Sequence, residues 1–356
     1  MNRTERRIRL KEKMKALGIP ALLVQKKENI KYLSGFNSTD CSLVITDHVD
    51  YLLTDFRYEQ AAREECSDFR LVLISGRKPL PEALASLGIE HIGIEEKVVS
   101  AHLYKKLSDA LGGDGRLIAA DGLVEQLRAI KDAEELEVIG RAESLCDSCF
   151  SYILGLIRPG ITERQLAFEI EFFLRQNGAS SLSFDTICVS GRRSALPHGM
   201  PSDKPLEKGD FVTLDFGCVL EDYCSDMTRT VAIGPVSDFQ KEIYGLVLES
   251  QLTACKELKA GVTCSFGDSS ARQVIEGAGY GKCFGHGLGH GVGLAVHEAP
   301  TLNPSSHEVL GKNMVVTIEP GIYIPGEFGV RIEDLVFITD SGIIIKSKSS
   351  KELIIL

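Results

Sequence analysis

The sequence predicts an α+β protein with two domains, a small α/β domain over residues 1–122 and a larger domain over residues 123–356. A chain of 356 residues is long enough to form two hydrophobic cores. In the first part of the chain, short strand-like segments alternate with helical or turn segments. A long helical pattern follows them, and beyond it two segments of the sequence each occur twice.

The first domain is predicted from helical spacing and from a series of short apolar segments. Residues 4–17 have the spacing of an amphipathic helix, and a second helix is expected over residues 56–66. Strands are expected where branched apolar residues are concentrated, over residues 21–24, 41–46, 50–54, 70–74 and 91–95. This alternation predicts a small α/β domain.

The second domain begins with a helical pattern over residues 123–156 and is expected to contain an internal repeat. IRPGIT at 157–162 resembles LKAGVT at 258–263, and LEKGDFVTLDFG at 206–217 resembles LGKNMVVTIEPG at 310–321. The offsets between partners are 101 residues (258 against 157) and 104 residues (310 against 206). Because the two offsets agree closely, we interpret the domain as two related halves rather than as a chance similarity.

Composition and charge argue against several classes of partner. Hydrophobic residues make up 44% of the chain and charged residues 25%, as in an ordinary globular protein. The net charge of −10 disfavours binding to nucleic acid or to an anionic membrane. The sequence has no apolar run of about 18 residues, so no membrane span is expected.

The N-terminus and the cysteines favour a cytoplasmic location. The charged start MNRTERRIRLKEKMK leaves no apolar core for a signal peptide. The ten cysteines lack the spacing of a disulfide framework, which suits a reducing compartment. Cys146 and Cys149 form a CxxC pair, but they lie in a helical segment with no second pair nearby. We therefore expect no zinc or redox role for them.

A glycine-rich segment, GHGLGHGVGLAVHE at 285–298, contains three of the eight histidines. Glycine at every second position from 285 to 293 lets backbone or a ligand approach closely, while His286, His290 and His297 project from the segment. A dinucleotide-binding frame is not supported, because apolar residues stand where its last glycine belongs. The open interpretations are a metal site, an acid/base site and a tight bend whose histidines bind backbone carbonyls.

Carboxylates at the ends of strand-like segments favour the metal interpretation. The repeat superposes Asp215 on Glu319, so each half ends an apolar strand with one acid. Asp226 and Glu333 follow at short range, and Arg331 is expected on the same strand face as Glu333. Each acid alone could belong to a surface hairpin. Together, they predict the ligands of a cation, because isolated buried carboxylates are costly.

The ligand types indicate the number and kind of metal ions. Four carboxylates around one cavity carry more negative charge than one divalent ion can balance, so two ions are expected. Such pairs activate a shared water for hydrolysis. Oxygen-rich ligation with one imidazole favours Mn, with Co and Zn as alternatives.

Five motifs of the larger domain resemble, in order and spacing, those of the "pita-bread" metallopeptidases, in the branch of Xaa-Pro aminopeptidases and prolidases (Xaa-Pro dipeptidases). They are ALPHGMPSDKPLEKGDFVTLDFG, DYCSDMTRT, HGLGHGVGLAVHE, EPGIYIPG and GVRIED. The first domain, with YLSGF and TDFRY, is similar to the creatinase-like N-terminal domain of that branch. The resemblance implies a pita-bread catalytic domain whose two halves are related by a pseudo-two-fold axis.

The resemblance also implies metal ligands. Asp215 would bind one ion, His290 and Glu319 the other, and Asp226 and Glu333 would bridge the two. Glu319 would also be the general base for the bridging water.

Further roles are implied for the cavity walls. His198 and His297 would contact substrate and stabilise the tetrahedral intermediate, and His286 would serve in substrate binding or proton transfer. Tyr323 and Arg331 would lie behind the ligands, where a guanidinium can hold a carboxylate in place.

The implied activity is removal of the N-terminal residue from peptides with proline in second position. Dipeptidases of the family tend to carry an arginine soon after the residue matching His297, where it can pair with the substrate carboxylate. No arginine occurs over residues 298–330, which favours an aminopeptidase, with prolidase as the alternative. A catalytically inactive protein-binding module, a metal-free creatinase-like hydrolase and a methionine aminopeptidase are less favoured, because all five ligands and the extra domain are present.

The resemblance implies a homodimer formed through the first domain. The loop from Phe36 to Asp40 is the candidate for a segment that reaches the active site of the neighbouring subunit.

Overall fold

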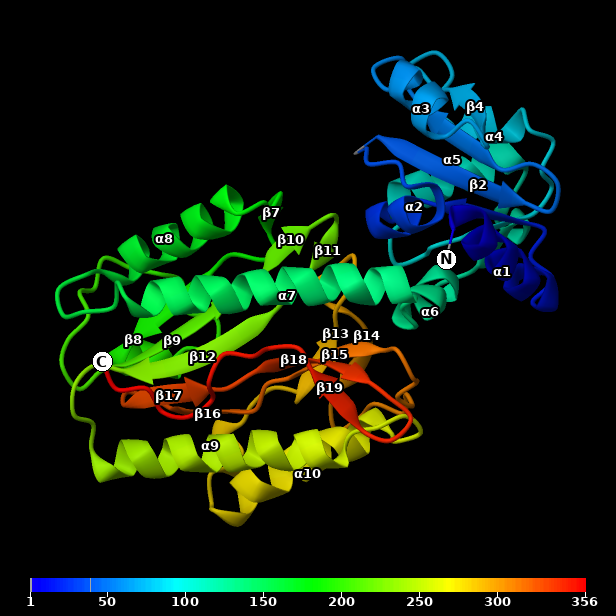
Figure 1. The fold of residues 1–356 in the computed structure, drawn as a ribbon. Helices are drawn as coiled ribbons and strands as arrows, with labels where there is room; N and C mark the ends of the chain where they lie inside the picture. Colours follow the sequence, from blue (N-terminus) through cyan, green and yellow to red (C-terminus); the bar gives the residue numbers. More distant parts are fainter. Residues whose placement is uncertain (1, 39) are drawn as a thin grey trace. The chain divides into compact units, whose positions relative to one another are not determined.

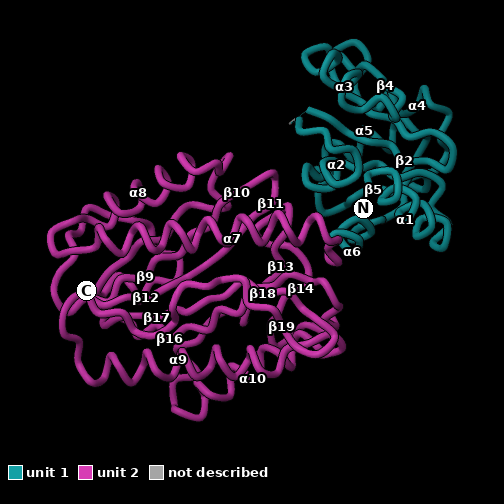
Figure 2. Tube along the Cα trace, viewed as in Figure 1, with its two compact units in different colours: residues 1–128 teal, residues 129–356 magenta. Residues whose placement is uncertain are grey.

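The computed structural model describes residues 2–38 and 40–356 and contains two compact units, residues 1–128 and 129–356 (Figures 1 and 2). Both units combine helices with sheets, which confirms the α+β prediction. The boundary predicted after residue 122 precedes helix α6 (Leu123–Ala129), whereas the compact units divide at the end of that helix. Among the described residues, no helix combines the length and the apolar character needed to cross a membrane.

Unit 1 is built on a six-stranded sheet in the order β4-β3-β2-β1-β5-β6. Strand β1 pairs antiparallel with β2 and parallel with β5, so the sheet is mixed. Its strands are β1 Ala21–Val24, β2 Cys41–Thr46, β3 Tyr51–Thr54, β4 Arg70–Leu73, β5 Ile92–Ile94 and β6 Leu117–Ala119. Its helices are α1 Arg3–Ala16, α2 Lys27–Ser34, α3 Glu59–Glu65, α4 Leu80–Ala85 and α5 Ala101–Leu111. All five predicted strands are present.

The Phe36–Asp40 loop belongs to unit 1, although Thr39 is outside the described residues. Phe36 is 3% exposed, and its ring meets Tyr58 edge-on with centroids 6.4 Å apart. This aromatic side chain therefore contributes to the core of its own unit.

Unit 2 places its strands between two helix pairs. Figure 1 shows α7 and α8 on one side of the strands and α9 and α10 on the other. The helices are α7 Ala133–Leu154, α8 Glu163–Gln176, α9 Asp238–Glu257 and α10 Cys264–Gly277. The strands of the first half are β7 Ser181–Leu182, β8 Ile187–Ser190, β9 Phe211–Phe216, β10 Cys218–Leu220, β11 Tyr223–Cys224 and β12 Met227–Ala232. Those of the second half are β13 Gly289–Gly291, β14 Glu298–Leu302, β15 Val315–Ile318, β16 Gly321–Ile324, β17 Phe328–Arg331, β18 Asp334–Ile338 and β19 Ile343–Ile345.

Matching backbone hydrogen bonds confirm the internal repeat. In the first half the Gly160 amide donates to the Leu206 carbonyl at 2.9 Å, and in the second half the Gly261 amide donates to the Leu310 carbonyl at 2.8 Å. The donors and acceptors are offset by the same spacings as the repeated sequence segments. Each half therefore connects the start of a helix to the start of a sheet strand in the same way.

The helix starts of the two halves also correspond. Thr162 caps α8 by accepting from the Gln165 amide, and Thr263 caps α10 by accepting from the Phe266 amide. The Gln165 side chain completes a capping box by accepting from the Thr162 amide at 2.9 Å.

Antiparallel pairing brings the repeated strands into the centre of the unit. β9 pairs with β8 and β12, and β15 pairs with β13 and β18. In β13 the alternate glycines allow close strand approach: a Cβ on Gly289 would lie 2.2 Å from the Thr317 carbonyl oxygen, and one on Gly291 would lie 2.3 Å from that of Ala299.

The expectation that Arg331 and Glu333 share a face of one strand was wrong. Arg331 ends β17, Asp334 begins β18, and Glu333 lies in the connection. The Glu333 amide donates to the Thr228 carbonyl of β12 at 3.1 Å, so the chain changes partner at this point.

We predict that Gly289→Ala lowers the free energy of unfolding by about 3 kcal/mol, because its methyl group would overlap the Thr317 carbonyl. Urea unfolding measures the change. The matched control is Gly285→Ala, where a Cβ meets nothing within 4 Å, and its effect should stay within about 0.5 kcal/mol. Equal effects of the two substitutions would contradict this account of the glycine pattern.

Candidate metal centre

The predicted ligands come from both halves and meet in one cavity of 670 Å³. Asp215 lies in β9 and Asp226 just before β12, whereas His290 lies in β13 and Glu319 directly after β15. Glu333 enters from the connection between β17 and β18. The remaining predicted site residues also line this cavity: His198, His286, His297, Tyr323 and Arg331.

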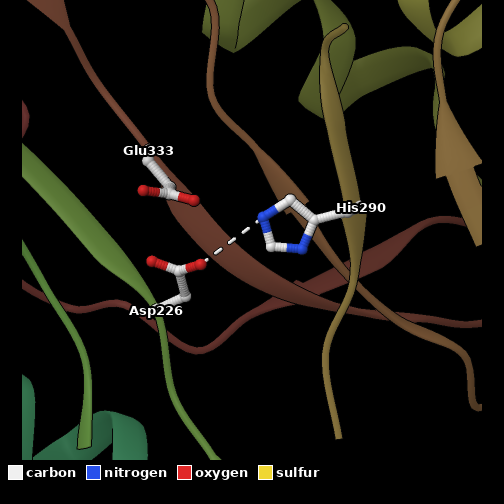
Figure 3. A group of neighbouring side chains, drawn as sticks. All are labelled: Asp226, His290 and Glu333. Carbon is white, nitrogen blue, oxygen red and sulfur yellow. Dashed lines mark ion pairs between the residues drawn. The ribbon is translucent and has the colours of Figure 1, made fainter. Parts of the chain in front are cut away.

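The His290 imidazole lies at the centre of the ligand cluster. Its Nε2 is 3.3 Å from Glu319 Oε1 and 3.5 Å from Asp226 Oδ2. Figure 3 shows the Asp226 and Glu333 carboxylates and the His290 ring converging on one another. One ligand-type atom from each of these three residues lies within 4.8 Å of the other two. The three side chains therefore offer their donor atoms to a common point.

A backbone contact fixes the tautomer of His290. Its Nδ1 lies 3.1 Å from the Gly291 carbonyl oxygen, which can only accept a hydrogen bond. We therefore assign the proton of the neutral ring to Nδ1, which leaves the lone pair of Nε2 directed at the carboxylates. This arrangement is typical of a metal-ligating histidine.

Three of the carboxylates are buried, and hydrogen bonds do not satisfy all of their oxygens. Asp215, Asp226 and Glu333 are 8%, 4% and 1% exposed. Asp215 Oδ1 and Glu333 Oε1 have no hydrogen-bond partner among the described residues. Burial and the neighbouring negative charges raise the pKa of Asp226 and of Glu333 well above the usual values. Free carboxylate oxygens in such a cluster fit the binding of divalent cations.

Glu319 differs from Asp226 and Glu333 because its pKa is lowered rather than raised. Burial alone would raise its pKa, but the hydrogen bond and the charge that the His290 ring supplies when it is protonated lower the pKa of Glu319 to about 2. The Thr317 hydroxyl also donates to Glu319 Oε1 at 3.0 Å. Glu319 therefore stays ionised over the whole physiological pH range.

Arg331 connects the ligand cluster to His286 through Tyr323. Its Nη2 donates to Asp215 Oδ2 at 2.5 Å, and its Nη1 donates to the Tyr323 hydroxyl oxygen at 2.6 Å. His286 Nδ1 lies 2.8 Å from the Gly287 carbonyl, so this nitrogen is the donor. His286 Nε2 then accepts from the Tyr323 hydroxyl at 3.0 Å. Burial lowers the pKa of His286, which keeps the ring neutral near pH 7.

Two further histidines form the cavity wall. The His297 side chain is exposed, and its ring centroid lies 4.2 Å from that of His290. Burial and then the charge of His290 lower the pKa of His297. His198 is exposed and lies in the loop after β8. Both side chains can reach a molecule held in the cavity.

Sequence reasoning missed several residues of the site. Glu298 lines the cavity next to His297 and forms a buried ion pair with Lys131 at 2.8 Å. An apolar part of the wall was also missed, formed by Phe184, Ile187, Pro197 and Met200. Apolar residues of this kind have no spacing that marks them as cavity lining, although Pro197 and Met200 flank His198 in one of the quoted motifs.

Comparison with known proteins gives matches over both units. Residues 137–340 match metallopeptidase family M24, and residues 6–130 match the creatinase/prolidase N-terminal domain. An Xaa-Pro dipeptidase of Pyrococcus furiosus is 38% identical, over 98% of this chain and 99% of its own length.

Two solved structures are similar over nearly the whole chain. The Xaa-Pro dipeptidase from Bacillus anthracis is 42% identical with a TM-score of 0.95, and the match covers 100% of both chains. An X-Pro aminopeptidase from Thermotoga maritima is 40% identical with a TM-score of 0.86, and the match covers 97% of this chain and 100% of that one.

We predict that Mn²⁺ raises the melting temperature more at pH 8 than at pH 5.5. Because the pKa values of Asp226 and Glu333 are raised, the metal-free folded protein holds protons that the unfolded chain has released. Its stability therefore falls as the pH rises above the ordinary carboxyl pKa, whereas cation binding displaces those protons and is favoured at higher pH.

Thermal unfolding with and without Mn²⁺ measures this difference, and Asp226→Asn should remove most of it. An equal Mn²⁺-induced shift at the two pH values would contradict the proton release. An undiminished shift in Asp226→Asn would exclude this side chain as a ligand.

Proposed function

This chain belongs to metallopeptidase family M24 and carries a creatinase/prolidase N-terminal domain, and we propose that it hydrolyses Xaa-Pro dipeptides. The observation that carries this proposal is the set of buried carboxylates from both halves, which converge on Nε2 of His290. The Pyrococcus and Bacillus relatives, both named Xaa-Pro dipeptidase and matched over nearly their whole length, support the dipeptide as substrate.

The Xaa-Pro aminopeptidase activity favoured by the sequence becomes the second candidate. It was favoured because residues 298–330 contain no arginine, yet relatives named dipeptidases support the alternative better. The Thermotoga relative named X-Pro aminopeptidase keeps the second candidate under consideration. A non-catalytic binding module is disfavoured because the chain belongs to a peptidase family and has the complete predicted ligand set.

Five residues would hold two divalent ions, most favourably Mn²⁺, which would supply Lewis-acid chemistry for attack of water on the peptide carbonyl. They are Asp215, Asp226, His290, Glu319 and Glu333. The ionised Glu319 is the proposed acceptor of a proton from the attacking water. Arg331 holds one oxygen of Asp215 and leaves Oδ1 of the same carboxylate available.

The histidines would act on the substrate from the cavity walls. His198 and His297 are proposed to donate hydrogen bonds to the oxygen on which negative charge develops. His286 has both ring nitrogens engaged, by the Gly287 carbonyl and the Tyr323 hydroxyl. This arrangement supports proton transfer through Tyr323 as its role, rather than direct binding of substrate.

The proline nitrogen leaves as a secondary amine and must gain a proton on leaving. The acidic cluster would attract the free amino group at the other end of the substrate.

We also propose a cytoplasmic homodimer. All ten cysteines are free, which is compatible with a reducing compartment.

We predict that Glu319→Gln lowers kcat on an Xaa-Pro dipeptide at least about 100-fold, because the amide cannot accept the proton. Steady-state kinetics in Mn²⁺ measure the loss, with circular dichroism and bound-metal content as controls for folding and ligation. An unchanged kcat would exclude Glu319 as the base.

We predict that kcat/KM for Ala-Pro exceeds that for Ala-Pro-Ala. The dipeptidase relatives support this preference, and parallel kinetics on the two peptides measure it directly. Cleavage of the tripeptide with higher kcat/KM would instead favour the aminopeptidase. Cleavage of neither peptide by metal-loaded protein would contradict both candidate functions.

A further inference from the structure

A fully buried carboxylate outside the metal cluster gathers hydrogen bonds from both ends of the segment that carries His198. It belongs to Glu163, the first residue of α8, which is 0% exposed. The segment, residues 191–202, is called the His198 loop below. It follows β8, begins with a 3-10 turn over Gly191–Ala195 and brings His198 to the cavity.

One carboxylate oxygen of Glu163 accepts hydrogen bonds at the start of the His198 loop, and the other accepts them from within the loop and at its end. Oε1 accepts from the amide of Ser190 at 2.7 Å and from its hydroxyl at 3.0 Å. Oε2 accepts from the amide of Ser202 at 3.0 Å, from its hydroxyl at 2.7 Å, and from Arg193 Nε at 3.0 Å. One side chain therefore joins the residue before the loop to the residue that ends it.

These contacts are not needed to begin the helix. Thr162 and Gln165 already form the capping box of α8. Five donors are directed at a carboxylate that offers about four lone-pair positions, so its hydrogen-bonding capacity is fully used. A buried ion is tolerated only where such charge-assisted bonds replace water. The negative charge of Glu163 therefore organises the loop rather than the helix.

The middle of the His198 loop is held from the opposite side by the strands of the metal site. Arg331 Nη1 donates to the Pro197 carbonyl at 3.3 Å, and the Gly329 amide donates to the Ser194 hydroxyl at 2.9 Å. Within the loop, Arg193 Nη2 donates to the Met200 carbonyl at 2.5 Å. Backbone groups on both sides of His198 are thus fixed, and Arg193 carries the restraint from Glu163 to a point two residues past the histidine.

We propose that Glu163 is a positioning residue that holds the His198 imidazole at the cavity. This inference rests on the proposed function for the effect on turnover, because His198 is there a contact to substrate. It makes no use of the metal ligands, because the hydrogen bonds of Glu163 described above go to Ser190, Arg193 and Ser202. The charge of Glu163 should therefore matter for the part of catalysis that depends on His198 and not for metal binding.

A double-mutant cycle tests the proposal. Glu163→Gln should lower kcat/KM for Ala-Pro about 10-fold, because the amide replaces an acceptor oxygen with an NH₂ group facing donors. His198→Ala should lower it about 100-fold. In the double variant, kcat/KM should be no more than about twofold lower than in His198→Ala, because Glu163 acts through His198. Fully additive losses, or no loss in Glu163→Gln, would overturn the proposal.

A neighbouring ion pair provides the matched control. Arg164, the next residue of α8, pairs with Asp203 just beyond the His198 loop at 2.8 Å, but both side chains are exposed. Arg164→Gln should leave kcat/KM within about twofold. The Mn²⁺ affinity of Glu163→Gln should also be within about twofold of the parent protein. A large loss of Mn²⁺ affinity would indicate general distortion and contradict the proposed role.

The histidine itself gives a readout that does not need turnover. The imidazole NMR signal of His198 should shift in Glu163→Gln and stay in place in Arg164→Gln. An unshifted signal in folded Glu163→Gln overturns the positioning role whether or not the protein cleaves Xaa-Pro peptides. If Glu163→Gln does not fold, Arg193→Gln replaces it, since this partner is 33% exposed and contacts both Glu163 and Met200. The same outcomes then apply.

Discussion

Mutual repulsion among the ionised forms of Asp215, Asp226 and Glu333 is the constraint on which unit 2 depends. The fold keeps these carboxylates buried and close together, and two of their oxygens have no hydrogen-bond partner among the described residues. An arrangement of this kind is unfavourable without cations. Asp215 and Asp226 come from the first half of the repeat and Glu333 from the second. Binding a cation would therefore join the two halves at the place where their strands meet.

A buried polar network behind the cavity resists that repulsion. Arg229 is 1% exposed and donates to the Glu333 carbonyl and, at 2.8 Å, to Asp334 Oδ1. Lys351 reaches the other oxygen of Asp334 at 2.6 Å. On the other side, Glu143 accepts from the Asp226 amide at 3.3 Å. These partners fix the backbone next to two proposed ligands, which lets the side chains keep their positions.

The sequence was sufficient to predict the acids and the histidine that the structure brings to one cavity, but not the buried residues that hold them in place. Asp215 and Glu319 were found because they occupy equivalent ends of repeated apolar strands, and His290 because alternate glycines isolate it. Arg229, Asp334 and Glu163 are charged residues with no such signal, since their burial depends on partners far away in the chain. The break between Arg331 and Glu333 was missed for a related reason: at this break the Glu333 amide donates to the carbonyl of Thr228, which lies more than a hundred residues earlier in the chain. The substrate length could not be predicted from the sequence, because the absence of one arginine does not describe a cavity wall.

The central claim is that five side chains from two related halves hold a pair of metal ions. Anomalous diffraction at the Mn edge, from crystals of the Mn²⁺-loaded protein, tests it most directly. The account predicts two peaks in the cavity, both in contact with Asp226 and Glu333, one also with Asp215 and the other with His290 and Glu319. Peaks at another place, or a cavity without two ions at saturating Mn²⁺, would contradict it.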